Sequence, residues 1–413
     1  MKLFSSLEES AVNLPRECNL ALASRLLLLL FAFALGVLRP AVADDKETAK
    51  QPPKLADIDW PVFRGNGFST GVAPSELPEK LELLWKIAPE DAAFETTAVI
   101  AKGVVYVGGL DPDGVLYAVD LKNGKIKWEY QVESGFQCSP AVRDQVVYIG
   151  DSDGLIPAVV AKSGQKKWTF ETGAEIISSP NFHKDSVLVG SYDQNLYCLN
   201  VKNGETRWKF ETDGPVHSSI SVASMKTAAG VQDRAFVAGC DQILHIVDLA
   251  DGNEVGQLEI QSQAAATPAV SGSLLYVGNL ADTFFCINWQ KPEVVWSYQH
   301  PVRQFAYHSS AAVTAKAVFV GGRDRLLKAL NPKTGELLWS FPTKRKIDSS
   351  PVVAGKRVFF GTDGGILYGL NAQSGEKEWE YEAGGNFASS PAIAGGRLVI
   401  GNGDGDLYCF GKK

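Results

Sequence analysis

A tryptophan that recurs about every forty residues constrains the fold of this chain more than any other feature. The marker positions are occupied by Trp85, Trp128, Trp168, Trp208, Gly256, Trp296, Trp339 and Trp379. A repeat of this length is typical of proteins built from copies of one supersecondary unit, because each unit can bury its apolar faces only against its neighbours. The chain is therefore expected to form eight similar units.

Each copy predicts four short antiparallel strands. Small polar residues and a proline, such as Ser178-Ser179-Pro180, precede the first strand, and a second strand such as VVYIG (146–150) follows a polar turn. A third strand such as LYCLN ends at a glycine turn, Asn203-Gly204, and Trp208 lies at the start of the fourth strand. Such sheets bury one another when they stack radially. The prediction is an all-β, eight-bladed β-propeller of four-stranded antiparallel blades.

The two ends of the chain are expected to complete one blade together. The last copy, Ser389 to Gly411, stops after its third strand, whereas the strand at 81–87 precedes the first complete copy. The N-terminal strand is therefore predicted to become the fourth strand of the C-terminal blade. The fourth blade, with an insertion at 225–233 and Gly256 in the tryptophan position, is expected to be looser than its neighbours.

The N-terminal region has the pattern of an export signal. An apolar run at 26–38 follows Arg25 and precedes Ala41-Val42-Ala43. We predict a cleaved signal peptide at 1–43, a flexible leader at 44–59 and a propeller domain at 60–413. An uncleaved anchor is the alternative, although a membrane span needs about 20 apolar residues. Cys18 precedes the apolar run, so nothing supports lipid attachment at a mature N-terminal cysteine.

Composition and cysteine usage narrow the function classes. The net charge of −7 argues against a nucleic-acid partner. Five cysteines follow the signal, an odd number that leaves at least one unpaired, and three of them occupy a repeat position held elsewhere by Ala or Gly. They are interpreted as small buried residues. Without a CxxC pair, thioredoxin-like, haem and structural zinc sites are not expected.

The sequence assigns no catalytic, cofactor-binding or metal-ligating residue. Acidic residues recur near the turn between the second and third strands, and turn hydrogen bonding explains them better than a cation site. The five histidines match no metal-ligand spacing, and no nucleophile elbow or phosphate loop is present. The acidic turn residues are Asp113, Asp153, Asp193, Asp241, Asp324, Asp363 and Asp404.

One group of residues predicts a binding surface. The loops between blades and the turns between second and third strands emerge on one face of a propeller, and between 299 and 346 this face collects basic and aromatic residues. Arg and Tyr dominate interface energetics, so this patch is a candidate anchor for an acidic or extended partner; a solvated rim is the alternative. The candidates are Arg303, Phe305, Tyr307, His308, Arg323, Arg325, Lys344, Arg345 and Lys346.

The repeat and the opening Trp60-Pro61-Val62-Phe63-Arg64-Gly65 resemble a known family. The pattern S-S-P-A-V, VYVG, DG-x-LYAL-D and TG-x-x-x-W resembles the PQQ-like propeller repeat from about Trp85 to Gly411. This repeat occurs in quinoprotein alcohol dehydrogenases and in the outer-membrane protein assembly factor of Gram-negative bacteria. Propellers host unrelated activities, so the resemblance implies a fold more firmly than a function.

Three functions stay open at this point. The favoured hypothesis is a periplasmic or secreted monomeric scaffold that binds envelope proteins or extended peptide segments and has no membrane span after cleavage. The resemblance also allows a dehydrogenase with PQQ and calcium in the central funnel, although the adjacent cysteine pair often found in that class is missing. The third possibility is a sensor of a small molecule in the funnel.

Overall fold

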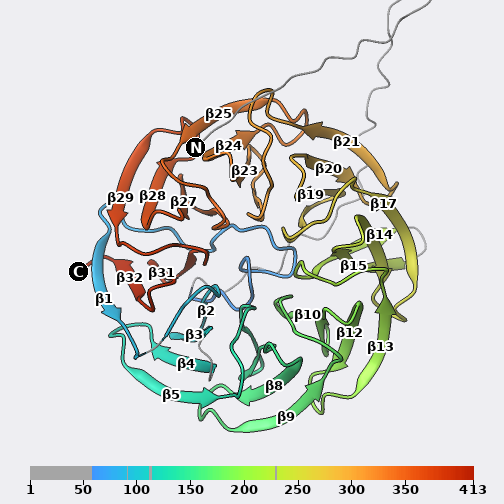
Figure 1. Ribbon diagram of the computed structural model, residues 1–413, viewed down its shortest axis with the longest axis horizontal. Helices are drawn as coiled ribbons and strands as arrows, with labels where there is room; N and C mark the ends of the chain where they lie inside the picture. The colour runs from blue at the N-terminus through green and yellow to red at the C-terminus, as the bar shows by residue number, and fades with distance from the viewer. Residues whose placement is uncertain (1–57, 91, 111–113, 228–229) are drawn as a thin grey trace, which may run out of the picture. The chain divides into compact units, whose positions relative to one another are not determined.

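The computed structural model describes residues 58–90, 92–110, 114–227 and 230–413. The predicted signal peptide and nearly all of the predicted leader lie outside these residues. Those described form eight four-stranded antiparallel sheets, arranged as blades around a central axis, as Figure 1 shows. The predicted all-β, eight-bladed propeller is confirmed. Within the described residues, no helix is long and apolar enough to cross a membrane.

The first seven blades each use four consecutive strands. Blade 1 contains β2 (Val99–Ala101), β3 (Val104–Gly108), β4 (Val115–Asp120) and β5 (Ile126–Gln131). Blade 2 contains β6 (Ala141–Arg143), β7 (Val146–Tyr148), β8 (Leu155–Val160) and β9 (Lys166–Glu171). Blade 3 contains β10 (Asn181–His183), β11 (Ser186–Gly190), β12 (Asn195–Asn200) and β13 (Thr206–Glu211). Blade 4 contains β14 (Ser221–Thr227), β15 (Gly230–Ala238), β16 (Ile243–Asp248) and β17 (Glu254–Glu259).

Blades 5 to 7 continue this order around the ring. Blade 5 contains β18 (Ala269–Ser271), β19 (Leu274–Gly278), β20 (Phe284–Asn288) and β21 (Glu293–Tyr298). Blade 6 contains β22 (Ala312–Val313), β23 (Val318–Gly321), β24 (Leu326–Leu330) and β25 (Leu337–Pro342). Blade 7 contains β26 (Val352–Ala354), β27 (Arg357–Gly361), β28 (Ile366–Asn371) and β29 (Lys377–Glu382). The first strand of each blade lies next to the axis and the fourth lies at the rim (Figure 1).

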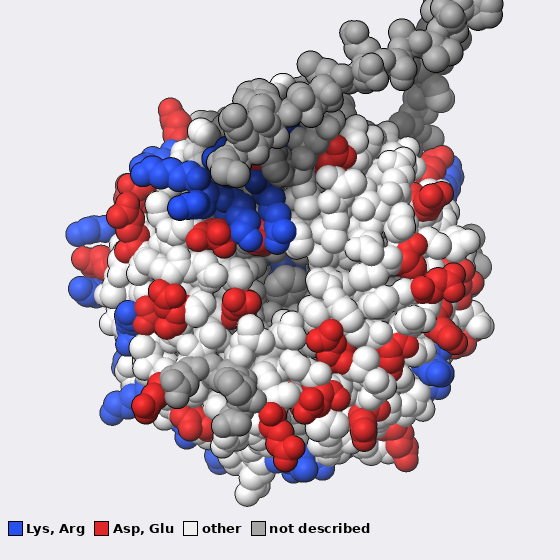
Figure 2. All heavy atoms as spheres, viewed as in Figure 1, with Lys and Arg blue, Asp and Glu red and all other residues white. Residues whose placement is uncertain are grey.

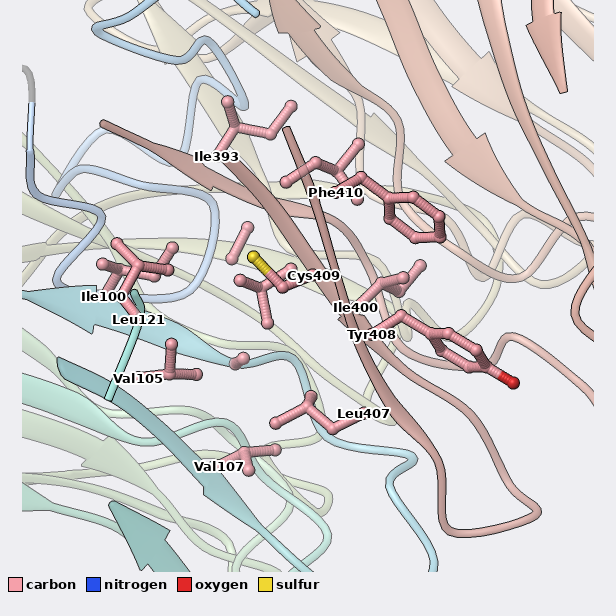
Figure 3. Packing of buried hydrophobic residues seen from close by; sticks show 14 of the residues in the cluster. Ile100, Val105, Val107, Leu121, Ile393, Ile400, Leu407, Tyr408, Cys409 and Phe410 are labelled. Atoms are coloured by element: carbon pink, nitrogen blue, oxygen red, sulfur yellow. The ribbon is translucent and has the colours of Figure 1, made fainter. Parts of the chain in front are cut away.

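Blade 8 joins the two ends of the described chain. It contains β30 (Ala392–Ala394), β31 (Arg397–Gly401), β32 (Leu407–Gly411) and β1 (Glu82–Ile87). Strand β1 pairs antiparallel with β32, with Glu82 opposite Gly411 and a bulge between Leu83 and Trp85. The predicted closure by an N-terminal strand is therefore confirmed. Figure 3 shows Val105 and Val107 of blade 1 packed in one core with Leu407 and Cys409 of blade 8.

The repeated tryptophan connects each blade to the next. Trp128 Nε1 donates to the carbonyl oxygen of Ala161 in blade 2 at 2.9 Å, and its ring lies against Gly164, where a Cβ atom would approach it to 2.9 Å. Glycine is required there by both the contact and its φ of +73°. Comparable tryptophan bonds join five further pairs of blades, with donors Trp85, Trp168, Trp208, Trp296 and Trp339.

The junction between blades 4 and 5 is built differently. Gly256 replaces the tryptophan and faces Pro292, whose Cγ would lie 2.9 Å from an added Cβ. Trp289 of blade 5 is 3% exposed and packs edge-on against Phe236 of blade 4, with ring centroids 5.3 Å apart. The large ring is thus supplied by the neighbouring blade. The expectation that blade 4 is looser stays a prediction.

The segment from 60 to 73 runs along the inner strands and closes one end of the channel. Its carbonyl oxygens accept hydrogen bonds from the amides of inner-strand residues in six blades: Ile100, Val142, Val222, Val270, Val313 and Val353. In blade 3 the side-chain amide of Asn181 donates to Gly67 instead, at 3.0 Å. Trp60 is fully buried. Phe63, from the same segment, lines the central channel.

Arg64 lies at the centre of this closure. Its side chain is 1% exposed and donates to the carbonyl oxygens of Ala311, at 3.1 Å, and of Ser350, at 3.3 Å, and to that of Pro351. Burial lowers the pKa of its guanidinium to about 9. Gly71 is required beside it, because a Cβ atom there would lie 1.9 Å from Nη2. The segment therefore bonds to blades 6 and 7 through a side chain as well as through its backbone.

Candidate functional site

The other end of the channel is built on a closed ring of hydroxyl groups. In each blade a Ser or Thr just before the first strand donates its backbone N–H to the hydroxyl oxygen of the equivalent residue in the next blade, at 2.9–3.1 Å. Because Ser390 donates back to Thr97, the circle is complete. The ring residues are Thr97, Ser139, Ser179, Ser219, Thr267, Ser310, Ser350 and Ser390.

The residue two positions before each ring hydroxyl lines a central funnel. These positions hold Glu95, Gln137, Ile177, His217, Ala265, His308, Asp348 and Ala388, and the funnel has a volume of about 200 Å³. Phe63 of the closing segment also lines it. The ring of Ser and Thr hydroxyls is thus uniform, whereas the side chains that line the funnel above it differ from blade to blade.

A buried residue fixes each funnel side chain in place. At seven of the eight junctions, the residue three positions before the ring hydroxyl packs against a glycine at or just after the end of the second strand of the preceding blade; a Cβ on Gly108, for example, would lie 2.7 Å from Phe136. Tyr307 occupies this position in blade 6, is 2% exposed and packs on Gly278. Tyr307 is therefore a core residue and does not lie on the surface where the sequence placed it.

Two histidines in the funnel are held neutral. Burial lowers the pKa of His308 to about 4, and the nearby positive charge of Arg323 acts in the same direction. Burial also lowers the pKa of His217, whose Nδ1 lies 2.5 Å from the hydroxyl oxygen of Tyr192. Each neutral imidazole offers one donor and one acceptor. His308, predicted as part of a rim patch, lies inside the funnel wall.

The remaining predicted residues lie on the loop face, around blade 6. Arg303 and Phe305 lie between β21 and β22, Arg323 and Arg325 lie between β23 and β24, and 344–346 lie between β25 and β26. Figure 2 shows Lys and Arg side chains gathered in this sector, while Asp and Glu side chains are spread over much of the rest of the face. The structure thus brings together residues that the sequence separates by up to 43 positions.

Part of this positive charge is neutralised locally. Arg323 binds both carboxylate oxygens of Asp348, at 2.9 and 3.1 Å, and Lys346 Nζ lies 2.8 Å from the same carboxylate. These two cations lower the pKa of Asp348 against the effect of its burial. Arg303 donates to the carbonyl oxygen of Asp324 at 3.1 Å. These three cations therefore hold the loops together.

Three cations of the group remain free to bind a partner. Arg325, Lys344 and Arg345 are exposed, and no acidic side chain among the described residues forms an ion pair with them. Phe305, beside them in the sequence-predicted patch, is 53% exposed, and Val302 in the same loop is 83% exposed. We call Arg325, Lys344, Arg345 and Phe305 the basic sector.

Exposed apolar side chains are concentrated on the same side of the ring. Of ten large exposed apolar residues in the described part of the chain, eight belong to blades 4 to 6 or to the loop between blades 5 and 6. These residues lie on three neighbouring blades and one loop, so exposed apolar side chains are unevenly distributed around the ring. The eight are Val231, Val255, Val294, Val295, Val302, Phe305, Leu337 and Leu338.

Three of the acidic turn residues form the turn hydrogen bonds that the sequence predicted, whereas the side chain of Asp363 forms an ion pair with Lys346. Asp193, Asp241 and Asp324 each accept a hydrogen bond from the backbone amide two residues later, at 3.1–3.2 Å. The described residues contain no group of three or more His, Cys, Asp or Glu side chains that could hold a metal ion. Asp113 lies outside the described residues.

Comparison with known proteins supports the architecture. A family model described as outer membrane protein assembly factor BamB matches residues 80–298 and 303–412. The chain belongs to this family. A search of curated proteins found no match.

Solved structures with the same fold include family members and enzymes. BamB from Moraxella catarrhalis aligns with a TM-score of 0.64 and 19% identity, over 81% of this chain and 100% of that one. Quinohemoprotein alcohol dehydrogenase from Comamonas testosteroni aligns with a TM-score of 0.74 and 14% identity, over 87% and 82% of the two chains. At these identities the likeness establishes the fold alone.

The funnel does not fit the quinone and calcium of such dehydrogenases. Calcium takes six to eight oxygen ligands, carboxylates among them. Only Glu95 and Asp348 bring carboxylates to the described funnel wall, and Asp348 is bound by Arg323 and Lys346. The volume of about 200 Å³ is also smaller than the roughly 300–1,000 Å³ of pockets for larger ligands.

Proposed function

We propose that this chain is a non-catalytic binding protein of the cell envelope, which captures an acidic segment of a partner protein at the basic sector. The observation that carries the proposal is the set of three exposed cations without acidic partners in the described structure, beside an exposed aromatic ring. Arg and aromatic side chains contribute strongly at interfaces, and complementary charge steers association.

The setting in the envelope rests on two independent points. The matched family is described by its role in outer membrane protein assembly. The apolar run at 26–38 followed by Ala43 predicts export. A binding role also agrees with the funnel's lack of a donor set for calcium.

The direct test compares two triple variants of the mature chain. R325A/K344A/R345A removes the cations of the basic sector, whereas K122A/K202A/K333A removes three exposed lysines from turns between third and fourth strands on the opposite face. Both variants change the net charge by the same amount. Binding of a fluorescent peptide of alternating Glu and Phe is measured by anisotropy, at low and at high salt.

The proposal expects at least a tenfold loss of affinity for the first variant, little change for the second, and weaker binding of wild type at high salt. Thermal unfolding of both variants should match that of wild type. Equal losses in the two variants, or no loss in the first, would contradict a recognition role for the basic sector.

A cofactor test addresses the alternative function. The mature chain mixed with PQQ and calcium is expected to show no bound quinone absorbance and no dye-linked alcohol oxidation. Turnover with alcohol that requires both additions would overturn the non-catalytic proposal.

A further inference from the structure

The hydroxyl ring leaves its donors unused. Each ring oxygen accepts the N–H of the preceding blade, and each hydroxyl still carries one hydrogen. Among the described residues, none of the eight hydroxyls donates a hydrogen bond to protein. All eight line the funnel and are at most 8% exposed. The base of the funnel is therefore a circle of eight hydroxyls, each with one hydrogen still available for a bond.

The wall above the ring adds both donors and acceptors. Gln137 contributes its amide oxygen, since its Nε2 already donates to Ser152 Oγ at 3.3 Å and to Glu175 Oε2 at 3.4 Å. His217 and His308 contribute neutral imidazoles, with Nδ1 of His217 bonded to Tyr192, and Glu95 and Asp348 contribute carboxylates. The ring hydroxyls are buried, and a buried polar hydrogen without an acceptor costs free energy unless a ligand or water supplies one. A ligand that fits must carry donors and acceptors in comparable number.

Charge and polarity exclude most other ligand classes. An anion would face Glu95 and Asp348, while a cation would find no cluster of carboxylates in the described wall and would lie near Arg323. An apolar molecule would leave the ring hydroxyls without partners. Phe63 offers one apolar surface in an otherwise polar cavity, which suits a ring with polar edges and an apolar face.

We propose that the funnel binds a neutral polyhydroxylated molecule the size of one monosaccharide. The volume of about 200 Å³ admits a single six-membered sugar ring. The ring hydroxyls donate to ligand oxygens, Gln137 Oε1 and Glu95 accept from ligand hydroxyls, and Phe63 contacts the apolar face. This inference does not depend on partner capture at the basic sector.

The test uses polyhydroxylated six-membered rings that are neutral or charged. D-Glucose and myo-inositol are the neutral probes, glucuronate is the anionic match and glucosamine is the cationic match, each titrated into the mature chain by calorimetry and ligand-observed NMR. A neutral probe is expected to bind at roughly millimolar Kd, at least fivefold more tightly than both charged matches.

Variants locate the site. Gln137→Leu keeps the size of an exposed side chain but removes its donor and acceptor, and is expected to weaken the neutral probe at least fivefold. Lys344→Ala, on the adjacent rim, should change nothing. Absence of saturable binding by either neutral probe, tighter binding of glucuronate or glucosamine, or equal affinity in wild type and Gln137→Leu would each overturn the proposal.

Discussion

The two ends of the central channel use the same eight inner strands but are completed in different ways. At the closed end, backbone carbonyls of 60–73 accept the inner-strand amides, and Trp60 and Arg64 are buried. At the open end, the blades bond to one another through the hydroxyl ring, and the side chains above it vary from Ile177 to His217 to Ala388. The first end is fixed by backbone bonding, and the second is free to differ in chemistry.

This difference separates the residues that stabilise the fold from those that are available for binding. A buried amide or carbonyl left without a partner costs about 1–3 kcal/mol, so the closed end tolerates little change. In the described part of the chain, side chains that line the funnel above the ring or lie on the loop face do not form hydrogen bonds with the backbone of the eight ring residues. Substitutions of these funnel and loop-face side chains, unlike those of the ring hydroxyls, should therefore alter binding with small effects on unfolding.

The largest effect is expected at Arg64. Arg64→Ala leaves the carbonyls of Ala311, Ser350 and Pro351 without their buried donor and opens a cavity, so the free energy of unfolding should fall by about 3–5 kcal/mol. Urea denaturation measures this, with Arg345→Ala as the matched arginine control at the open end. If Arg64→Ala lowered the free energy of unfolding by less than about 1 kcal/mol, the closed end would not be more sensitive to substitution than the open end.

A hydroxyl of the ring should have an intermediate effect. Ser219→Ala removes the acceptor of the Ser179 amide at 2.9 Å and should cost about 1–2 kcal/mol. The same urea titration applied to Ser340→Ala, an exposed serine on β25, should show almost no change. If the two variants unfold alike, the ring does not connect the blades energetically.

The funnel histidines predict a modest pH dependence. The pKa of His308 is about 4 in the folded chain and about 6.5 when unfolded, so the unfolded state binds the extra proton between these values. Stability should be fully present above pH 6.5 and fall as the pH drops toward 4. His308 should contribute roughly 1 kcal/mol of this, allowing for solvent screening.

Thermal unfolding across this range, compared between wild type and His308→Gln, isolates the contribution. The variant stays neutral and should show a flatter profile. A steeper decline in the variant, or identical slopes, would show that His308 does not resist protonation in the folded state.

The smallest effect is expected at the basic sector. Lys344→Ala removes an exposed side chain and should change the free energy of unfolding by less than about 0.5 kcal/mol. A loss above about 1 kcal/mol would mean that this surface supports the fold, and the division between the two ends would have to be redrawn.

The blade architecture could be predicted from sequence because a tryptophan and a turn glycine, such as Trp128 and Gly164, recur in successive copies of the repeat. Trp289 could not be assigned, since its role depends on packing against Phe236 in the preceding blade. The path of residues 60–73 could not be predicted either. The segment is held by hydrogen bonds from backbone amides, and these do not depend on which side chains are present. The sequence indicated only that the propeller domain begins at residue 60.

The candidate site was predicted in part. Loop positions correctly gathered Arg325, Lys344 and Arg345, whereas Tyr307 was misplaced because its position in the repeat matches buried Phe136 rather than a surface loop. The funnel wall was missed. Counting back two residues from each ring hydroxyl would have identified Glu95 and His217, but the sequence does not reveal that those hydroxyls form a ring.

Native-state hydrogen exchange of the mature chain, resolved by residue, tests most directly whether the closed end is part of the cooperative core. The amides of Val142, Val222, Val270 and Val353, which donate to 60–73, are predicted to exchange only through global unfolding. The amides of Lys344 and Arg345 should exchange through small local openings. If the inner-strand amides exchanged as readily as those of the open-end loops, residues 60–73 would separate from the blades without global unfolding. That result would contradict the assignment of the closed end to the cooperative core.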